Sequence, residues 1–578
     1  EESPPFASAG EWDIFLRHEL GASVAAYVAK PALLGRDFND EQQVRDDYAG
    51  RELLELVQNA ADAAAEEGGN GRVLIDVRRT GLFVANTGQP FRPSGVSSLM
   101  TAHLSDKPQR KRGLIGAKGL GFRAILNWSR EPLISSGALE LAFSRSHSER
   151  AVRELGAQHS NVTKFLNGRR PLPAPILPFP LFGPAIENIG ATGPGRELIS
   201  SVRQLRDAGY NTVIASPFFS EKAFNKAKEQ TAEFEPRFLL FVRALVEIEI
   251  RVQGFETRIW RKSPTSGDHL ELEIVEGDAS TAESWICRYA DGELAEDPER
   301  PADQPSRYEL AVALRTDDAN ERGELHCYFP TSVAVPFPAL FHATLEITSN
   351  RKSLKDQSAQ NDEVLGKLAD FYAQTLSELR QDGVVENALE FLYPDETFPE
   401  PLKPFEKAVY EAAAQRSIIA TIGGEHVRAD ETRLGPQGYD KFFPERLFPG
   451  LARCSAASDL VVLRALGVEA MAADEAIDVL RKADLDLEER AGVIAGIAQH
   501  LPAKFHLRSF LIDQKDRPLK ASNSCFPPPT SGRPPVLPRW ARGKFLSSPL
   551  WDRLSAALPG TPREKILRLK SFGVEEYN

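Results

Sequence analysis

Glu-Leu-Val-Gln-Asn-Ala-Ala-Asp-Ala occupies residues 55–63, and this stretch has the spacing of an amphipathic helix. Glu55, Asn59 and Asp62 lie at positions i, i+4 and i+7, which share one face of a helix. We therefore predict a helix that packs on a sheet through its apolar face and turns its polar face into a cavity. The apolar face consists of Leu53, Leu56, Val57, Ala60 and Ala64.

A predicted β-hairpin follows this helix. Residues 73–77 have the composition of a strand, Gly81 supplies a turn, and residues 82–84 resume as a second strand. The second strand leads directly into Asn86-Thr87-Gly88. The hairpin is therefore expected to deliver a polar side chain to the edge of a pocket.

A glycine-rich segment comes third, with four glycines within residues 113–121. Because glycine has no side chain, backbone N–H groups in such a segment can approach phosphate oxygens closely. A helix is expected from Phe122 to about Trp128, and its N-terminus would present a positive dipole end to the same anion. A glycine-rich segment alone is more often a flexible turn, so its place after the other two segments is what favours a phosphate site.

The polar helix face offers side chains suited to a magnesium triphosphate. Asn59 has a carbonyl oxygen for a hard cation that keeps most of its water. Glu55 is placed to orient and deprotonate a water molecule against a terminal phosphate. An acidic helix face is more often simply solvated, and the order of the three segments favours the nucleotide site over that alternative.

Together the three segments resemble the GHKL superfamily, which comprises gyrase, heat shock protein ninety, histidine kinases and MutL. The superfamily pattern is E-x-x-x-N-x-x-D-A, then D-x-G, then G-x-x-G-x-G-F. This resemblance implies an α+β chain that begins with a Bergerat-type α/β sandwich and binds ATP and Mg²⁺. The matching residues are Glu55, Asn59, Asp62, Ala63, Gly88, Gly116 or Gly119, Gly121 and Phe122.

Two positions concern the adenine side of the implied pocket. The aspartate of D-x-G, which accepts a hydrogen bond from the adenine amino group, is Asn86 here. An amide oxygen can still accept that bond, but a neutral acceptor makes a weaker bond than a carboxylate does. Residues 209–214 resemble the superfamily's G-T-x-I strand, which implies that Thr212 lies beside the base. A strand threonine satisfied by the backbone is the alternative.

Within the superfamily, residues 50–60, 88–91 and 118–123 resemble the sacsin-type branch, which also occurs in large bacterial proteins of phage-defence loci. Residues 337–352 resemble that branch's stretch ending in S-N-R-R. By this resemblance Arg351, with Lys352 as the next candidate, contacts the terminal phosphate as a bidentate cation. A solvated arginine at a strand end is the alternative.

The resemblance thus assigns Glu55 and Arg351 as catalytic residues and Asn59 as the metal ligand. The implied nucleotide-binding residues are Asn59, Asp62, Asn86, Gly88, Gly116, Lys118, Gly119, Gly121, Phe122 and Thr212.

Composition agrees with a globular chain of several domains, since it has 578 residues of which 42% are hydrophobic. The net charge of −12 argues against a broad nucleic-acid surface. The cysteines are scattered and form no C-x-x-C motif, so neither a disulfide framework nor structural zinc is indicated. With no signal peptide and no apolar run of membrane length in the sequence, we expect a cytoplasmic protein without membrane contact.

We predict four parts: residues 1–225 as an N-terminal arm with the ATP-binding domain, 226–385 as a transducer-like α/β domain, and 386–500 and 501–578 as two mixed α/β repeat units. The transducer prediction rests on strands at 245–253, 271–276 and 308–314, followed by a helix at 363–380. The repeat prediction rests on residues 463–471, which recur in outline at 569–577. The second unit is expected to be truncated.

The expected function is slow, Mg-dependent ATP hydrolysis that drives a conformational switch. The resemblance implies the ATPase component of a bacterial anti-phage system that acts with a protein effector such as a nuclease, with a homodimer as one arrangement. Two alternatives stay open: a nucleotide-sensing scaffold that does not hydrolyse ATP, and a DNA-remodelling ATPase of the MutL or topoisomerase kind. The second alternative requires direct contact with nucleic acid.

Overall fold

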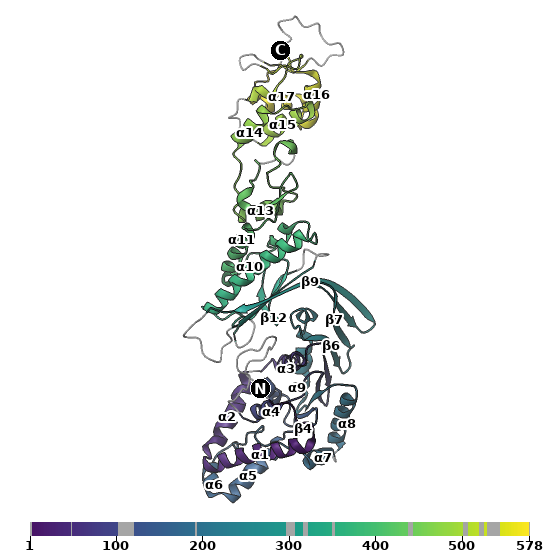
Figure 1. Ribbon diagram of the computed structural model, residues 1–578, viewed down its shortest axis with the longest axis vertical. Coiled ribbons are helices and arrows are strands. Elements are labelled where there is room, and N and C mark those ends of the chain that lie inside the picture. The colour runs from purple at the N-terminus through teal and green to yellow at the C-terminus, as the bar shows by residue number, and fades with distance from the viewer. Residues whose placement is uncertain are drawn as a thin grey trace. The chain divides into compact units, whose positions relative to one another are not determined.

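The computed structural model describes residues 3–47, 49–101, 121–190, 193–295, 307–315, 322–348, 353–436, 443–500, 507–519, 525–528 and 544–576 (Figure 1). The chain divides into two compact units, residues 1–368 and 369–578. The first unit is a mixed α/β fold with one large sheet, and helices predominate in the second. A mixed α/β chain is thus confirmed, and the predicted division into four parts stays a prediction.

The sheet of the first unit has thirteen strands in the order β12-β11-β13-β10-β9-β8-β7-β6-β1-β2-β5-β3-β4. β1 pairs with β6 in parallel and with β2 in antiparallel fashion, so it joins the two halves of the sheet. The strands are β1 (Gly71–Arg78), β2 (Gly81–Asn86), β3 (Leu133–Ser136), β4 (Leu139–Ala142), β5 (Thr212–Pro217), β6 (Leu245–Val252), β7 (Arg258–Ser266), β8 (His269–Glu276), β9 (Ala279–Glu293), β10 (Arg307–Leu314), β11 (Glu324–Cys327), β12 (Phe329–Ala334) and β13 (Leu340–Ala343).

Helices flank this sheet and continue into the second unit. In the first unit they are α1 (Ala9–Ala29), α2 (Ala32–Asp47), α3 (Glu52–Glu66), α4 (Pro93–Met100), α5 (Arg145–Gln158), α6 (Ser160–Leu166), α7 (Pro184–Gly190), α8 (Gly193–Asp207) and α9 (Glu221–Glu233), with 3-10 helices η1 (Gly121–Asn127) and η2 (Pro236–Leu240). Then follow α10 (Ala359–Gln381), α11 (Lys403–Ala414), α13 (Ala457–Ala465), α14 (Ala473–Lys482), α15 (Leu487–His500), α16 (Ser548–Ala557) and α17 (Pro562–Arg568).

The predicted helix and hairpin are both confirmed. α3 is rich in alanine, which favours a helix, and its acidic residues Glu52 and Glu55 lie in the first turn, where they complement the helix dipole. The helix ends at Glu66. Gly68 and Gly69 follow with positive φ angles of 104° and 94°, and Gly69 N–H donates to the Ala64 carbonyl at 2.8 Å. The hairpin is β1 and β2, which turn at Gly81.

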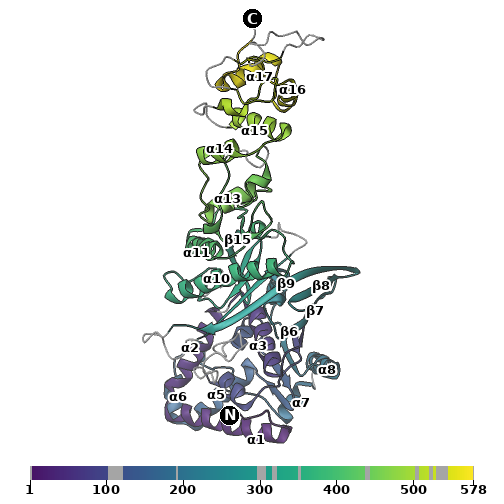
Figure 2. The ribbon, with the colours of Figure 1, turned by 45° about the horizontal axis from the view of Figure 1, so that its top comes forward.

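Helices cover both faces of the central strands (Figure 2). On one face, Val73, Ile75 and Val77 of β1 pack with the apolar side of α3. On the other face, Leu74 of β1 packs in a separate cluster with residues of α7 and α8. Because side chains alternate along a strand, β1 contributes to both cores, and the apolar side of α3 is held against the sheet.

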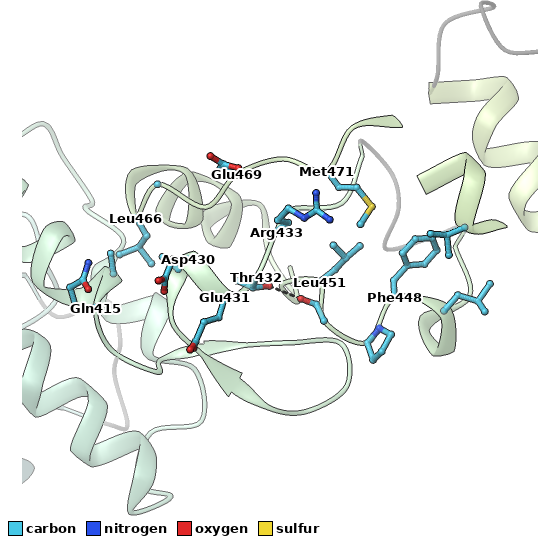
Figure 3. Close-up of a pocket in the computed structure, with 17 residues that line it drawn as sticks. Gln415, Asp430, Glu431, Thr432, Arg433, Phe448, Leu451, Leu466, Glu469 and Met471 are labelled. Atoms are coloured by element: carbon cyan, nitrogen blue, oxygen red, sulfur yellow. Dashed lines mark hydrogen bonds between the residues drawn. The ribbon is translucent and has the colours of Figure 1, made fainter. Parts of the chain in front are cut away.

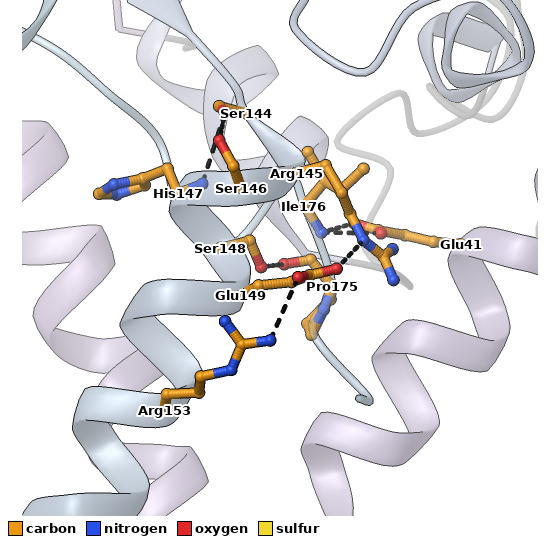
Figure 4. A network of polar contacts seen from close by, with 10 residues as sticks. All are labelled: Glu41, Ser144, Arg145, Ser146, His147, Ser148, Glu149, Arg153, Pro175 and Ile176. Atoms are coloured by element: carbon orange, nitrogen blue, oxygen red, sulfur yellow. Dashed lines mark hydrogen bonds and ion pairs between the residues drawn. The ribbon is translucent and has the colours of Figure 1, made fainter. Parts of the chain in front are cut away.

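The N-terminal helices are anchored through a buried carboxylate (Figure 4). Glu41 of α2 accepts hydrogen bonds from the backbone N–H groups of Ile176 and Leu177, each at 2.8 Å at its closest. The Ser148 hydroxyl of α5 donates to the Pro175 carbonyl at 2.5 Å. The proline-rich segment around residue 176 is therefore tied to α2 and α5.

The strands predicted at 245–253, 271–276 and 308–314 are confirmed as β6, β8 and β10, and the helix predicted at 363–380 is α10. No helix within the described residues is long and apolar enough to cross a membrane.

The second unit contains the same turn twice. Thr421 N–H donates to the Glu425 carbonyl at 2.8 Å, and Asp513 N–H donates to the Arg517 carbonyl at 2.9 Å. In each turn the first residue's side chain accepts the N–H of the fifth, at 3.2 Å for Thr421 and 3.1 Å for Asp513.

The similar stretches 463–471 and 569–577 each contain a glycine, and the two glycines have the same backbone conformation. Gly467 follows α13 with φ 80°, and Gly573 follows a 3-10 turn with φ 79°. Parallel bridges follow at non-equivalent positions: Ala470, three residues after Gly467, pairs with Leu434, and Val574, directly after Gly573, pairs with Cys525. The two glycines therefore share a backbone conformation, and the repeat stays a prediction.

Candidate functional site

The polar stripe of α3 faces a cavity of about 180 Å³ in the first unit. α3 forms one wall, α4 forms another, and the ends of β2 and β5 form the floor. Of the residues predicted for the site, Asn59, Asp62, Asn86, Phe122 and Thr212 line this cavity. Five predicted residues from four separate segments therefore meet at one place.

The polar residues of α3 differ in how far the cavity encloses them. Asn59 is half-buried and Asp62 is 4% exposed, and both line the cavity. Glu55 is half-buried one turn earlier and is not among the lining residues. Glu55 thus lies at the end of the site, beyond the part that the cavity encloses.

The orientation of the Asn86 amide is set by its neighbour. Its Nδ2 donates to the Thr87 carbonyl at 3.0 Å, and because a carbonyl can only accept, the nitrogen must be the atom on that side. Oδ1 is the remaining polar atom of a side chain that is 5% exposed and lines the cavity. Asn86 therefore presents an acceptor to the cavity, as the aspartate of the superfamily pattern would.

Two hydroxyl side chains, Thr212 and Ser136, lie next to Asn86 in order across neighbouring strands of the sheet. Asn86 and Thr212 are partners across β2 and β5, and Thr212 and Ser136 are partners across β5 and β3. The hydroxyls of Ser136 and Thr212 are 2.6 Å apart, and Phe91 N–H donates to the Ser136 oxygen at 2.9 Å. Since Ser136 can donate to Thr212, the Thr212 proton can be directed to a ligand.

Ser136 was not predicted, although a weak signal exists. Ser135 and Ser136 end an apolar strand just before Gly137, which has a positive φ of 57°. Asn211 is a second unpredicted contributor, and its Nδ2 donates to the Gly88 carbonyl at 2.9 Å. Single polar residues at strand ends are common, so neither position could be chosen without knowing which strands are neighbours.

Gly88 lets the loop after β2 pack directly against α3. Its φ is 126°, and a Cβ at this position would lie 2.7 Å from the Ala63 carbonyl carbon and from the Ala64 nitrogen. The next residue, Gln89, donates its N–H to the Ala63 carbonyl at 2.9 Å. A side chain at residue 88 would push the loop away from α3, so glycine is required here.

η1 begins at Gly121, where a helix was predicted, and Phe122 packs into the cavity wall. Arg123 is 1% exposed, and its guanidinium donates to the Thr101 carbonyl at 2.9 Å and to the Leu99 carbonyl at 3.4 Å. It thereby fastens η1 to the end of α4. The predicted Gly116, Lys118, Gly119, Arg351 and Lys352 lie outside the described residues.

Buried charge near this wall shifts two pKa values. Burial raises the pKa of Glu41 to about 7, opposed by hydrogen bonds from Ile176 and Leu177 and by the charge of Arg123. Burial lowers the pKa of Arg123, and Glu41 with other nearby carboxylates opposes that shift. The two groups therefore stabilise each other's charged form.

A larger cavity, of about 690 Å³, lies in the second unit (Figure 3). Its polar lining includes the carboxylates of Asp430, Glu431 and Glu469. Among the described residues that line it, the cation is Arg433, which is bound by Glu475 at 2.5 and 2.8 Å. Of the predicted site residues that the structure describes, none lines this second cavity, so the cavity beside α3 is the candidate site.

No protein-family profile matches the chain. The chain is similar to Protein NO VEIN of Arabidopsis thaliana, with 27% identity over 229 residues. That match covers 39% of this chain and 7% of the plant protein. The chain thus spans a small part of that relative's length.

Proposed function

We propose that the first unit is a Bergerat-type nucleotide-binding domain of the GHKL kind, which binds and hydrolyses Mg·ATP. The observation that carries the proposal is the meeting of Asn59, Asp62, Asn86 and Thr212 around one cavity. Asn86 Oδ1 has no hydrogen-bond donor within the described residues and suits the amino group of adenine. A fixed polar floor beside an apolar wall is typical of a site for a planar base.

The positions of Asn59 and Glu55 on α3 suit metal binding and proton transfer, respectively. The Asn59 oxygen is a suitable ligand for Mg²⁺, which usually binds one or two protein side chains and otherwise waters and phosphates. When bound, the metal would neutralise charge on the phosphates. Glu55 would accept a proton from the water that attacks the terminal phosphorus, while the bond from that phosphorus to the bridging oxygen breaks to give ADP and phosphate.

Steady-state hydrolysis tests this assignment. In Glu55→Gln the amide keeps the size of the side chain but cannot take the proton, so we expect turnover to fall by roughly 100-fold or more while Mg·ATP binding is kept. Asp13→Asn, which changes a carboxylate of α1 that does not line the cavity, is the control and should leave turnover unchanged. Equal turnover in Glu55→Gln and wild type would contradict the role of Glu55.

A second candidate is a nucleotide sensor that binds ATP without hydrolysis. It is favoured by the position of Glu55 outside the cavity lining and by the neutral Asn86 in place of a carboxylate. Saturable binding without turnover in the wild type would support it. A role with an effector protein in antiviral defence rests on the sacsin-type resemblance and is proposed for either candidate.

A further inference from the structure

The first turn of α3 is held by a buried carboxylate that lies on the same stripe as the proposed catalytic residues. Glu52 is 1% exposed and precedes Glu55 by three residues, so both lie on one face of the helix. The Glu52 carboxylate accepts hydrogen bonds from Gly50 N–H at 2.9 Å and from Asn127 Nδ2 at 3.0 Å. Asn127 also donates to the Arg45 carbonyl at 2.8 Å.

The remaining partner comes from a helix far along the chain. Gln230 of α9 is 8% exposed, and its Nε2 donates to the Glu52 carboxylate. Its Oε1 accepts the N–H of Leu53 at 3.1 Å. The N–H groups of a helix's first turn have no partner within the helix, so Gln230 satisfies one of them while it also holds Glu52. One amide therefore fixes both the backbone and the first side chain of α3.

The far half of α3 has a separate anchor. Gln89 N–H donates to the Ala63 carbonyl, and Gly88 packs on the backbone of Ala63 and Ala64. Asn59 and Asp62 lie closer to this second anchor, whereas Glu55 lies one turn from Glu52. Loosening the first anchor should thus displace Glu55 more than it displaces the two nucleotide-binding residues.

On this basis we infer that Gln230 is a positioning residue for Glu55, acting through Glu52 and the N-terminal turn of α3. This inference deepens the proposed function and rests on it for the effect on turnover. It also predicts a property that can be measured apart from turnover, because the hydrogen bond from Leu53 N–H to Gln230 is made between two protein groups.

α9 also leads into contacts with the strands beyond β6. η2 follows it, and Lys262 of β7 donates to the Leu239 and Val242 carbonyls at 2.7 and 3.0 Å. Tyr289 of β9 donates to the Leu240 carbonyl at 2.6 Å. The helix that carries Gln230 is thus followed, after the extended residues Phe234 and Glu235, by a segment bonded to the sheet.

The test compares variants of residue 230 in the full chain. Gln230→Leu removes both hydrogen bonds, and Gln230→Glu places two carboxylates together. In the double variant Glu52→Gln/Gln230→Glu an amide at 52 can donate to a carboxylate at 230, which can still accept Leu53 N–H. The amide nitrogen then replaces the Oε2 atom that accepts Gly50 N–H, so the exchange restores the contact with residue 230 and loses the one with Gly50. Asn225→Leu, an exposed amide on the same helix, is the control.

We expect both single variants to lower kcat by roughly 10- to 100-fold, since small misplacement of a catalytic group has effects of that size, while the Kd for Mg·ATP changes by less than about threefold. The double variant should recover part of the kcat lost in Gln230→Glu, because the contact between residues 52 and 230 returns while the bond to Gly50 N–H stays broken. Hydrogen exchange at Leu53 should quicken at least about tenfold in Gln230→Leu, because its N–H loses its partner.

Wild-type kcat in Gln230→Leu, or a rise in the Kd for Mg·ATP by the same factor as the fall in kcat, would overturn the inference. If the wild type itself shows no turnover, the proposed hydrolysis fails. Hydrogen exchange at Leu53 then tests by itself whether Gln230 anchors the first turn of α3. Unchanged exchange in Gln230→Leu would overturn it in either case.

Discussion

Asn86 and Thr212 face each other as partners across β2 and β5, and both side chains line the cavity beside α3. Each is less than a tenth exposed. Two polar side chains on a sheet floor are costly to bury unless they are satisfied. This pair therefore defines the part of the cavity where a ligand with complementary polar edges is favoured.

The first prediction concerns the base. Because Nδ2 of Asn86 is held by the Thr87 carbonyl, the site offers an acceptor and should prefer the 6-amino group of ATP to the 6-oxo group of ITP. Asn86→Leu should weaken the binding of ATP by roughly 5- to 100-fold, and it should abolish the preference for ATP over ITP. Competition titrations with ATP and ITP measure this preference. An unchanged preference in Asn86→Leu would refute the prediction.

The second prediction concerns the close approach at Gly88. Gly88→Ala should lower the free energy of unfolding by roughly 2–4 kcal/mol, because the added Cβ meets the backbone of α3. Gly209→Ala is the matched control, since Gly209 has φ 93° with nothing within 4 Å of the added atom, and it should cost about 1–2 kcal/mol from conformation alone. Urea unfolding of both variants measures the difference. Equal losses would show that the contact with Ala63 is unimportant.

The third prediction uses the raised pKa of Glu41, about 7 in the folded protein. A carboxyl with a folded pKa above its unfolded value binds more protons when folded, so stability falls as pH rises from about 4.5 to 7. Relative to Glu41→Gln, the wild type should lose roughly 3 kcal/mol over that window. Urea unfolding of both proteins between pH 5 and 8 tests this, and a difference independent of pH would contradict it.

The fourth prediction concerns His326, whose contribution to stability changes with pH in the opposite direction to that of Glu41. Burial, with His342 and Arg237, lowers the pKa of His326 to about 3. A histidine with a folded pKa below its unfolded value contributes stability above about pH 6.5, and that stability is lost as the pH falls towards 3. His326→Leu should thus be less sensitive to acid than wild type, while exposed His18→Gln should match wild type. Acid unfolding curves compare the three proteins, and identical curves for wild type and His326→Leu would rule this out.

The local elements of the site could be predicted from sequence because each has a strong local pattern. α3 has a helical period with alanines, and β1 and β2 flank a glycine turn. Asn86 and Gly88 could be placed because they end that hairpin. Thr212 was reached by resemblance to a strand motif, and the register with Asn86 confirms that it lies beside the cavity.

Partners that are distant in sequence could not be predicted. Ser136 reaches Thr212 only because β3 pairs with β5, and Gln230 reaches Glu52 from 178 positions away in the chain. Such contacts depend on strand order and helix packing, which a periodic pattern does not encode. The position of Glu55 outside the enclosed cavity likewise depends on how far α4 and η1 extend over α3.

The most direct test of the nucleotide site is calorimetric titration of the wild-type chain with ATP, in Mg²⁺ and in EDTA, beside Asp62→Ala and Asn59→Ala. The proposal predicts saturable binding to the wild type that is tighter with Mg²⁺, loss of that Mg²⁺ effect in Asn59→Ala, and binding weakened at least about tenfold in Asp62→Ala. Absence of saturable binding to the folded wild type, or equal affinity in all three proteins, would contradict it.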